Sequence, residues 1–314
     1  MAREHAQRLV RRVVRGSLEP EFSTMDTTAQ RVAVQLGQVI SRLNAQQTDI
    51  SLHDAEFSIF SQFGEDGIIQ YLVERTDVGD RSFIEFGVGS YREANTRFLL
   101  VKDNWRGLII DADSHHIEFL RQSQLAWRHN ITAISSFIMA DNIDRLLLDN
   151  GMKGDIGLLS VDIDGNDYWV LKAITAVRPR IIVCEYNSVF GAHRAVSVPY
   201  DPQFQAETAH YSRLYFGASL PALQHLLEAR GYVLVGCESH GANAFFVRSD
   251  VARDLSPLRP DEAYVRSRFR SSRDEHGQLS YVTGHGAVRA LIADLPLVDV
   301  TTGASLLVGD LPPE

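Results

Sequence analysis

Short apolar runs alternate with amphipathic stretches along the chain from residue 57 to about residue 248. The apolar runs have the length of strands, and the stretches between them carry apolar residues at helical spacing. Strands that alternate with helices are typical of a doubly wound α/β fold, a mostly parallel sheet with helices on both faces. The last two strands are joined by a short turn that contains Gly and Asn, so we expect them to pair antiparallel. The predicted strands are residues 82–86, 107–111, 131–138, 157–162, 180–185, 232–237 and 243–248, and the predicted helices are 64–75, 114–127, 142–150, 167–175 and 219–230.

The two ends of the chain follow other patterns. Residues 1 to about 50 carry apolar residues at near-helical spacing, which fits a helical appendage packed on the core, a dimerisation arm or a lid. Beyond residue 249 a highly charged segment precedes an apolar but irregular end, which we interpret as a tail lying over the domain. We therefore predict a helical N-terminal extension, a central α/β domain and a C-terminal tail, at residues 1–56, 57–250 and 251–314.

The amino-acid composition argues against several classes of function. The 314 residues carry a net charge of −9, which argues against general binding to nucleic acid or to anionic membranes. Two cysteines, Cys184 and Cys237, are too few for a zinc cluster, and Cys184 lies in an apolar run, which argues against a disulfide framework. No run reaches the roughly 20 apolar residues of a membrane span, and no apolar segment follows the basic N-terminus as it would in a secretory signal. We expect a cytoplasmic protein.

The first predicted strand runs directly into Glu85, Gly87 and Gly89. Glycines at this point let the backbone turn sharply and approach a ligand closely, and ligands bind at the carboxyl ends of such strands. Ser90 and Arg92 follow, so the third glycine of the dinucleotide fingerprint is missing. The turn therefore indicates a nucleotide-type cofactor site but disfavours a nicotinamide dehydrogenase.

Acidic residues also follow the next two strands. Asp111 ends the second strand, where a carboxylate can accept both ribose hydroxyls of a nucleoside, and Asp113 is placed to cap the next helix. Asp141 and Asn142 follow the third strand. Either of these two could bind an adenine edge or cap a helix.

The fourth and fifth strands end in the densest group of carboxylates. Asp162 and Asp164 end the fourth strand, where alternation would point both to one side, and Asp167 is placed to cap the following helix. Glu185 and Asn187 end the fifth strand. Because neighbouring strands lie about 5 Å apart, Asp162, Glu185 and Asn187 could share one Mg²⁺ or form a polar cluster without metal.

Histidines provide candidates for a general base. His193 and His210 lie in predicted loops after the fifth strand, above the same edge of the sheet. A histidine there could remove a proton from a substrate. We take Asp162, Asp164, His193 and His210 as the candidate catalytic residues.

Several ordered motifs resemble those of FkbM-type S-adenosylmethionine-dependent methyltransferases. The similarity covers roughly residues 57 to 190 in order and spacing, and the family usually has Glu where Asp164 stands. The ordered combination is far more specific than any single motif. The motifs are Ser61-Gln-Phe-Gly-Glu-Asp66, Phe83-Ile-Glu-Phe-Gly-Val-Gly89, Asn95-Thr96, Asn104-Trp-Arg-Gly-Leu-Ile-Ile-Asp111, Ser160-Val-Asp-Ile-Asp-Gly165 with Val170-Leu-Lys172, and the run ending at Glu185.

This resemblance implies a Rossmann-like, mostly parallel seven-stranded sheet with an antiparallel last strand pair. It implies methyl transfer from S-adenosylmethionine to a hydroxyl of a small molecule or glycan, of the sugar or polyketide type. Glu85, Gly87 and Gly89 would surround the methionine part of the cofactor, Asp111 would bind its ribose, and Gln62 would help to close the site. Some other O-methyltransferases hold a metal with acids at the same two strand ends, which supports Mg²⁺ as a second cofactor.

Two other classes fit parts of the sequence. The run from Val161 to Asn166 resembles the first motif of haloacid-dehalogenase-like phosphatases, in which the first Asp is the nucleophile and the second the acid/base. That motif normally opens its domain, whereas here two strand–helix units precede it. The third class is a non-catalytic module with a vestigial nucleotide site, which the intact Glu85, Gly87, Gly89 and Asp111 disfavour. We expect a small-molecule or glycan acceptor as partner, and a homo-oligomer if the N-terminal helices form an arm.

Overall fold

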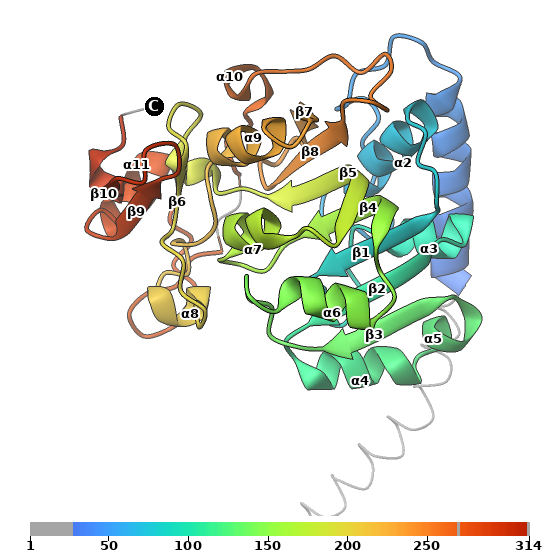
Figure 1. Ribbon diagram of the computed structural model, residues 1–314, viewed down its shortest axis with the longest axis horizontal. Coiled ribbons are helices and arrows are strands. Elements are labelled where there is room, and N and C mark those ends of the chain that lie inside the picture. Colours follow the sequence, from blue (N-terminus) through green and yellow to red (C-terminus); the bar gives the residue numbers. More distant parts are fainter. Residues whose placement is uncertain (1–27, 269–270, 313–314) are drawn as a thin grey trace, which may run out of the picture.

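Seven strands form one sheet at the centre of the computed structural model, which describes residues 28–268 and 271–312 (Figure 1). Their spatial order is β3-β2-β1-β4-β5-β8-β7. Strands β1 to β5 run parallel, and β8 is antiparallel to both β5 and β7. The predicted Rossmann-like sheet is confirmed, including its antiparallel last pair. The strands are β1 Ser82–Phe86, β2 Arg106–Asp111, β3 Ile131–Ser135, β4 Gly154–Val161, β5 Val177–Glu185, β7 Tyr232–Cys237 and β8 Asn243–Arg248.

Both faces of the sheet are covered, which explains why its strands read as continuous apolar runs. All five residues of β1 are buried. Alternate side chains enter different cores: Ile84 and Phe86 pack on one face, and Phe83 packs on the other. Helices α6, α7 and α9 contribute to the first core, and α2, α3 and α4 contribute to the second. These helices are α2 Glu65–Arg75, α3 Arg97–Asp103, α4 Ser114–Gln122, α6 Ile143–Asp149, α7 Asp167–Ala173 and α9 Leu220–Glu228.

Two predicted elements are shorter than the sequence suggested. The helix expected at 114–127 breaks at Ser123, whose backbone is extended, and continues as α5 (Gln124–Arg128). The strand expected at 131–138 ends at Ser135. Phe137 and Ile138 extended the apolar run of the sequence, but they lie in a loop, from which Ile138 packs into the core.

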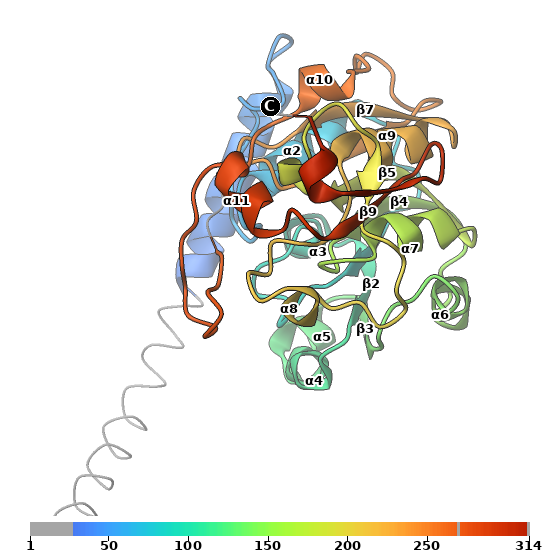
Figure 2. The same cartoon turned by 90° about the vertical axis from the view of Figure 1, so that its left-hand side faces the viewer.

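The C-terminal segment is more ordered than its irregular sequence suggested. Two of its strands join β6, which lies in the loop after β5, to make a second sheet of order β10-β9-β6. Phe190, Val196 and Tyr215 from that loop share a small core with Ile292 and Leu297. Figure 2 shows the C-terminal elements lying across the near edge of the large sheet. The elements are η1 Ser188–Phe190, β6 Val196–Ser197, α8 Ala206–Ala209, α10 Pro260–Ala263, α11 His285–Leu291, β9 Pro296–Asp299, β10 Ser305–Leu307 and η2 Val308–Asp310.

The structure describes part of the predicted N-terminal helical extension. Residues 28–45 are helical, whereas residues 1–27 lie outside the described residues. Gly37 lets this helix lie close to α3, because a Cβ at that position would come within 2.8 Å of the Phe98 ring. Four apolar side chains point outward and are more than half exposed: Val32, Leu36, Val39 and Leu43. No helix among the described residues is both long and apolar enough to cross a membrane.

Candidate active site

The turn after β1 has the backbone that the glycines predicted. Gly87 has φ +70°, and a Cβ there would lie 1.5 Å from the Asp162 carbonyl oxygen, so only glycine fits between β1 and the end of β4. Gly89 also has positive φ, and its N–H donates to Asp111 Oδ2 at 2.7 Å. The carboxylate at the end of β2 therefore holds the turn at the end of β1.

Asp111 and Asp113 have different structural roles. Asp111 Oδ1 accepts from the Asp113 N–H at 2.8 Å, so both oxygens of Asp111 contact backbone donors. Asp113 caps α4 by accepting from the His115 N–H at 2.7 Å, which confirms the cap prediction. Asp111 also lines a cavity of about 720 Å³, the Asp111 cavity, which extends to Phe137 and Ile138.

Asp141 and Asn142 do not belong to the wall of that cavity. The Asn142 side chain accepts from the Met139 N–H and donates to the Phe137 carbonyl, so it shapes the loop from 137 to 139. Asp141 is exposed. The cavity wall contains Phe137 and Ile138 instead. Sequence reasoning missed these two residues because their apolar character extended the predicted strand across them.

Glu85 is buried beneath a second cavity of about 380 Å³, the Glu85 cavity, which Gln62, Gly87 and Gly89 also line. Its carboxylate accepts from the backbone N–H groups of Asn95 at 2.7 Å and Thr96 at 3.0 Å. Burial raises the pKa of Glu85 to about 7, although these hydrogen bonds act in the opposite direction. Glu85 therefore ties the start of α3 to the end of β1.

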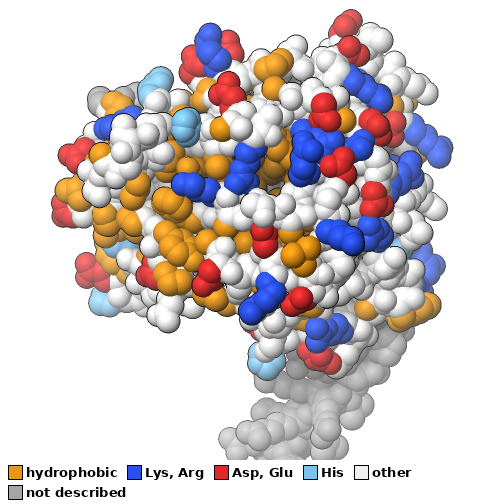
Figure 3. All heavy atoms as spheres, viewed as in Figure 1, with side chains coloured by type: hydrophobic (Ala, Val, Ile, Leu, Met, Phe, Trp, Pro, Cys, Tyr) orange, Lys and Arg blue, Asp and Glu red, His pale blue; other side chains and the backbone are white. Residues whose placement is uncertain are grey.

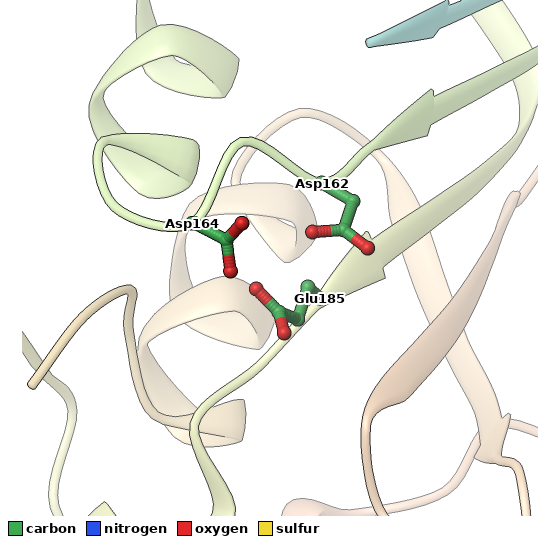
Figure 4. A group of neighbouring side chains, drawn as sticks. All are labelled: Asp162, Asp164 and Glu185. Atoms are coloured by element: carbon green, nitrogen blue, oxygen red, sulfur yellow. The ribbon is translucent and has the colours of Figure 1, made fainter. Parts of the chain in front are cut away.

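Three carboxylates meet at the ends of β4 and β5 (Figure 4). Asp162, Asp164 and Glu185 each place an oxygen within 4.8 Å of the others. Val161 is paired with Cys184, so Asp162 and Glu185 are the next residues in register on neighbouring parallel strands. β4 ends at Val161, and Asp164 reaches the group because its backbone adopts a left-handed conformation with φ +53°, not through the strand alternation that was expected.

We call Asp162, Asp164 and Glu185 the carboxylate cluster. Burial first, and then mutual repulsion, raise the pKa values of Asp162 and Glu185 well above the usual range. For Asp164 the pKa rises to about 6, again through burial and then repulsion from neighbouring acids. Glu185 Oε2 is buried and has no hydrogen-bond partner among the described residues. Three hard oxygen donors with an unpartnered buried oxygen fit a Mg²⁺-type ion.

Asn187 and Asp167 take structural positions, and the third carboxylate beside Asp162 and Glu185 is Asp164. The Asn187 side chain donates to the carbonyls of Leu214 and Phe216 and accepts from the Val189 N–H, which commits both ends of the amide to the backbone. Asp164 occupies the third place in the cluster. Asp167 accepts from two backbone N–H groups in the turn before α7, at 2.8 and 2.9 Å, and so holds that turn instead of capping the helix.

A third cavity, of about 410 Å³, is lined by Asp162, Asp164 and Glu185 together with His285. We call it the His285 cavity. His193 and His210 lie outside the walls of all three cavities: His193 is exposed, and His210 contacts Ser212 Oγ at 2.7 Å. The sequence offered no local signal for His285, which follows Glu185 by 100 residues and reaches the site only through tertiary packing.

The three cavities meet at two residues. Gly87 and Asp162 line the Asp111 cavity, the Glu85 cavity and the His285 cavity. Two of the cavities flank the glycine turn, and the third lies between the large sheet and the C-terminal segment. A ligand could therefore place one part in the Asp111 cavity and another part in the Glu85 cavity. The point that joins the two parts would then face the His285 cavity.

Comparison with known families identifies the central part of the chain. The Methyltransferase FkbM domain matches residues 57–234, more than half of the 314 residues. The chain has no significant match among curated proteins.

Solved structures show a general likeness. An O-methyltransferase from Bacillus cereus in complex with SAH is 14% identical, with a TM-score of 0.37; the match covers 68% of this chain and 89% of that one. The N-terminal domain of EvdMO1 with SAH bound is 11% identical, with a TM-score of 0.39; the match covers 67% of this chain and 94% of that one. TM-scores this low assign neither a substrate nor a metal to the chain.

Proposed function

Because the chain belongs to the FkbM family of S-adenosylmethionine-dependent methyltransferases, we propose that it transfers the methyl group to a hydroxyl of a small molecule or glycan, of the sugar or polyketide type. The observation that carries this proposal is the junction of three cavities at Gly87 and Asp162. A methyl donor has two parts that flank its sulfonium, and the acceptor must approach from a third direction. One cavity is available for each of these three groups: the two parts of the methyl donor and the acceptor.

In this proposal the adenosine part occupies the Asp111 cavity, with Asp111 on the ribose and Phe137 beside the base. The methionine part occupies the Glu85 cavity, where Glu85, Gly87 and Gly89 surround it and Gln62 helps to close it. The acidic walls of this cavity suit the α-ammonium of the cofactor. Asn142 supports the Asp111 cavity indirectly through the loop that its side chain holds, whereas Asp141 is exposed.

The acceptor occupies the His285 cavity. Its wall combines apolar Leu214, Phe216 and Val288 with polar Ser267 and Thr283, which suits a molecule with both hydroxyl groups and apolar surface. Figure 3 shows hydrophobic side chains gathered on the side of the molecule where β6 and α8 lie, whereas many of the Lys and Arg side chains lie on the other side.

The reaction is an in-line displacement at the sulfonium methyl. The acceptor oxygen forms the new bond to carbon, the carbon–sulfur electron pair stays on sulfur as S-adenosylhomocysteine, and the hydroxyl proton leaves. Most of the rate gain comes from holding the oxygen and the methyl in line at the junction. Asp162 lies at that junction and is the cluster residue best placed to orient the hydroxyl.

Mg²⁺ is the proposed second cofactor, with Asp162, Asp164 and Glu185 as its protein ligands. It would supply Lewis-acid polarisation of the acceptor hydroxyl. The cluster supports this because its raised pKa values and its unpartnered Glu185 oxygen reflect uncompensated negative charge. Family membership leaves no role for Asp162 and Asp164 as phosphatase nucleophile and acid.

The domain boundaries also stay proposals. We propose residues 57–250 as the methyltransferase domain, residues 1–56 as its helical extension and residues 251–314 as the segment that completes the acceptor side. The packing of Ile292 and Leu297 against the loop after β5 supports the last assignment.

The first experiment is a calorimetric titration with S-adenosylhomocysteine, with and without Mg²⁺, followed by an acceptor screen. We expect micromolar or tighter binding of S-adenosylhomocysteine. Methyl glycosides and polyketide alcohols, incubated with the methyl-labelled cofactor, should then give labelled ethers in the screen. Binding without methylation of any hydroxyl compound, but with methylation of amines or carbons, would refute the proposed acceptor class.

A further inference from the structure

Asn243, the first residue of β8, carries a side-chain oxygen that no group in the described part of the chain satisfies. The residue is 5% exposed, and its Oδ1 atom is buried without a hydrogen-bond partner there. A buried amide oxygen in this state costs free energy unless a ligand supplies a donor or a cation. Asn243 lies beyond residue 234, where the matched family domain ends, so it belongs to none of the motifs that indicated the family.

The other end of the amide fixes its orientation. Asn243 Nδ2 donates to Glu65 Oε1 at 2.9 Å, and Glu65 Oε2 accepts from the Phe63 N–H, also at 2.9 Å. Burial raises the pKa of Glu65, and its hydrogen bonds act in the opposite direction. An ionised Glu65 only accepts hydrogen bonds, so the amide keeps its NH₂ group on Glu65 and directs Oδ1 elsewhere.

The register of the sheet places Asn243 beside the carboxylate cluster of Figure 4. Asn243 is paired directly with Glu185 on antiparallel β5. The Tyr186 N–H donates to the Ala242 carbonyl, so Glu185 and Asn243 form a non-hydrogen-bonded pair, the kind whose side chains lie closer together. Directly opposed residues have Cβ atoms about 4.5–5.5 Å apart and point to one face of the sheet.

Asp162 extends the row on the other side of Glu185. It follows Val161, which is paired with Cys184, so Asp162, Glu185 and Asn243 are level across β4, β5 and β8. Two oxygens in this row, Glu185 Oε2 and Asn243 Oδ1, are buried and have no partner within the described ranges. A cation that contacts both oxygens accounts for the pair, because buried charges in proteins are paired or coordinate metals.

We propose that Asn243 Oδ1 is the fourth protein ligand of the Mg²⁺ site, beside the three oxygens of the carboxylate cluster. This inference rests on the proposed Mg²⁺ cofactor. Carboxylate and carbonyl oxygens suit Mg²⁺, and a neutral amide adds a donor without adding to the repulsion among three acids. The sequence predicted an amide ligand at Asn187. The Asn187 amide already contacts three backbone groups, whereas the Asn243 oxygen is available.

This assignment places the metal site between two cavities. Asn243 and Asp162 line the Glu85 cavity, and Asp162 and Glu185 line the His285 cavity. The ligands therefore come from both the cofactor side and the acceptor side of the junction. Glu65 is a positioning residue in this arrangement, because it orients the amide that binds the ion.

The first test compares metal and cofactor affinity in Asn243→Leu, which keeps the approximate size of the side chain and removes its oxygen. MgCl₂ alone and S-adenosylhomocysteine alone are titrated into the full-length protein by calorimetry. Loss of a group that only orients a metal ligand typically costs about 10–100-fold in affinity. We therefore expect the Kd of Mg²⁺ to rise by about tenfold or more, and that of S-adenosylhomocysteine to stay within about twofold. Asn130→Leu, at an exposed position before β3, is the control and should match wild type.

The pattern of affinities separates the alternatives. Unchanged Mg²⁺ binding with weakened S-adenosylhomocysteine binding would assign the oxygen to the α-ammonium of the cofactor and overturn the proposal. Unchanged binding of both would leave Asn243 a structural role and overturn it too. If the wild-type protein binds no Mg²⁺, the proposed metal cofactor fails together with this inference, and that failure is visible before any variant is made.

A second measurement does not depend on the folding of a variant. Mn²⁺ replaces Mg²⁺ in wild-type protein labelled with carbon-13 at the asparagine amide carbon, and electron–nuclear double resonance detects labelled carbons next to the metal. We expect a carbon-13 coupling from a directly bound amide, and we expect Asn243→Leu to remove it. A spectrum without this coupling, or a coupling that persists in Asn243→Leu, would overturn the proposal.

Discussion

Replacing Asp162 by Asn tests the carboxylate cluster directly. The change keeps the shape of the side chain and removes one charge from a group whose oxygens lie within 4.8 Å of one another. At an effective dielectric constant of about 20, two unit charges at that distance repel by about 3.5 kcal/mol. Since the raised pKa values show that protonation already relieves part of this repulsion, we expect a gain of about 1–2 kcal/mol in the metal-free protein.

With saturating Mg²⁺, the wild-type protein should become more stable than Asp162→Asn. At a concentration of about 100 times its Kd, a bound ligand stabilises the native state by about 2.7 kcal/mol. For a chain of this size each kcal/mol corresponds to a few degrees in Tm. The wild-type Tm should therefore rise clearly from EDTA to saturating MgCl₂, and that of Asp162→Asn should stay almost constant. Asp149→Asn, exposed at the end of α6, is the control and should behave as wild type.

The same assay gives a pH dependence with a definite sign. The folded-state pKa of Asp164 is raised to about 6, so the folded protein holds this proton more strongly than the unfolded chain. Stability without metal should fall as pH rises from about 4 to about 6. The Mg²⁺-induced rise in Tm should begin in this window, as Asp164 ionises, and should grow further above it, because the pKa values of Asp162 and Glu185 are raised well above the usual range. A Mg²⁺ effect of wild-type size in Asp162→Asn, or one that persists well below pH 4, would refute the metal site.

Three further changes test other parts of the chain. Gly87→Ala should abolish cofactor binding, because its Cβ would lie 1.5 Å from the Asp162 carbonyl oxygen; wild-type affinity in calorimetry would contradict the observed turn. Asp111→Ala should weaken S-adenosylhomocysteine binding by about tenfold or more through the loss of charge-assisted hydrogen bonds, and an unaltered Kd would remove Asp111 from the site. If the N-terminal helix is a dimerisation arm, the double variant Leu36→Glu/Leu43→Glu should give a monomer by light scattering, whereas an unchanged mass would reject that role.

The sheet could be predicted because its signals are local. Buried parallel strands are apolar along their whole length, and Gly87 and Asp111 occupy characteristic positions at strand ends. The pairing of Asp162 with Glu185 followed from the expectation that consecutive parallel strands are neighbours. Asn187 was predicted as a ligand because its type and position fit one. In the structure its amide donates to the carbonyls of a loop that returns about 27 residues later, a contact that no local pattern indicates.

The sequence by itself determined the alternation of strands and helices, the glycine turn and the acids that follow each strand, since these depend on periodicity and on backbone preferences of single residues. Only the tertiary structure decided which polar side chains meet. It brought Asp164 into the cluster through a left-handed backbone, and it placed His285 beside Ser188 across 97 residues of chain. Contacts over such separations depend on the packing of the whole C-terminal segment, and no local pattern encodes them.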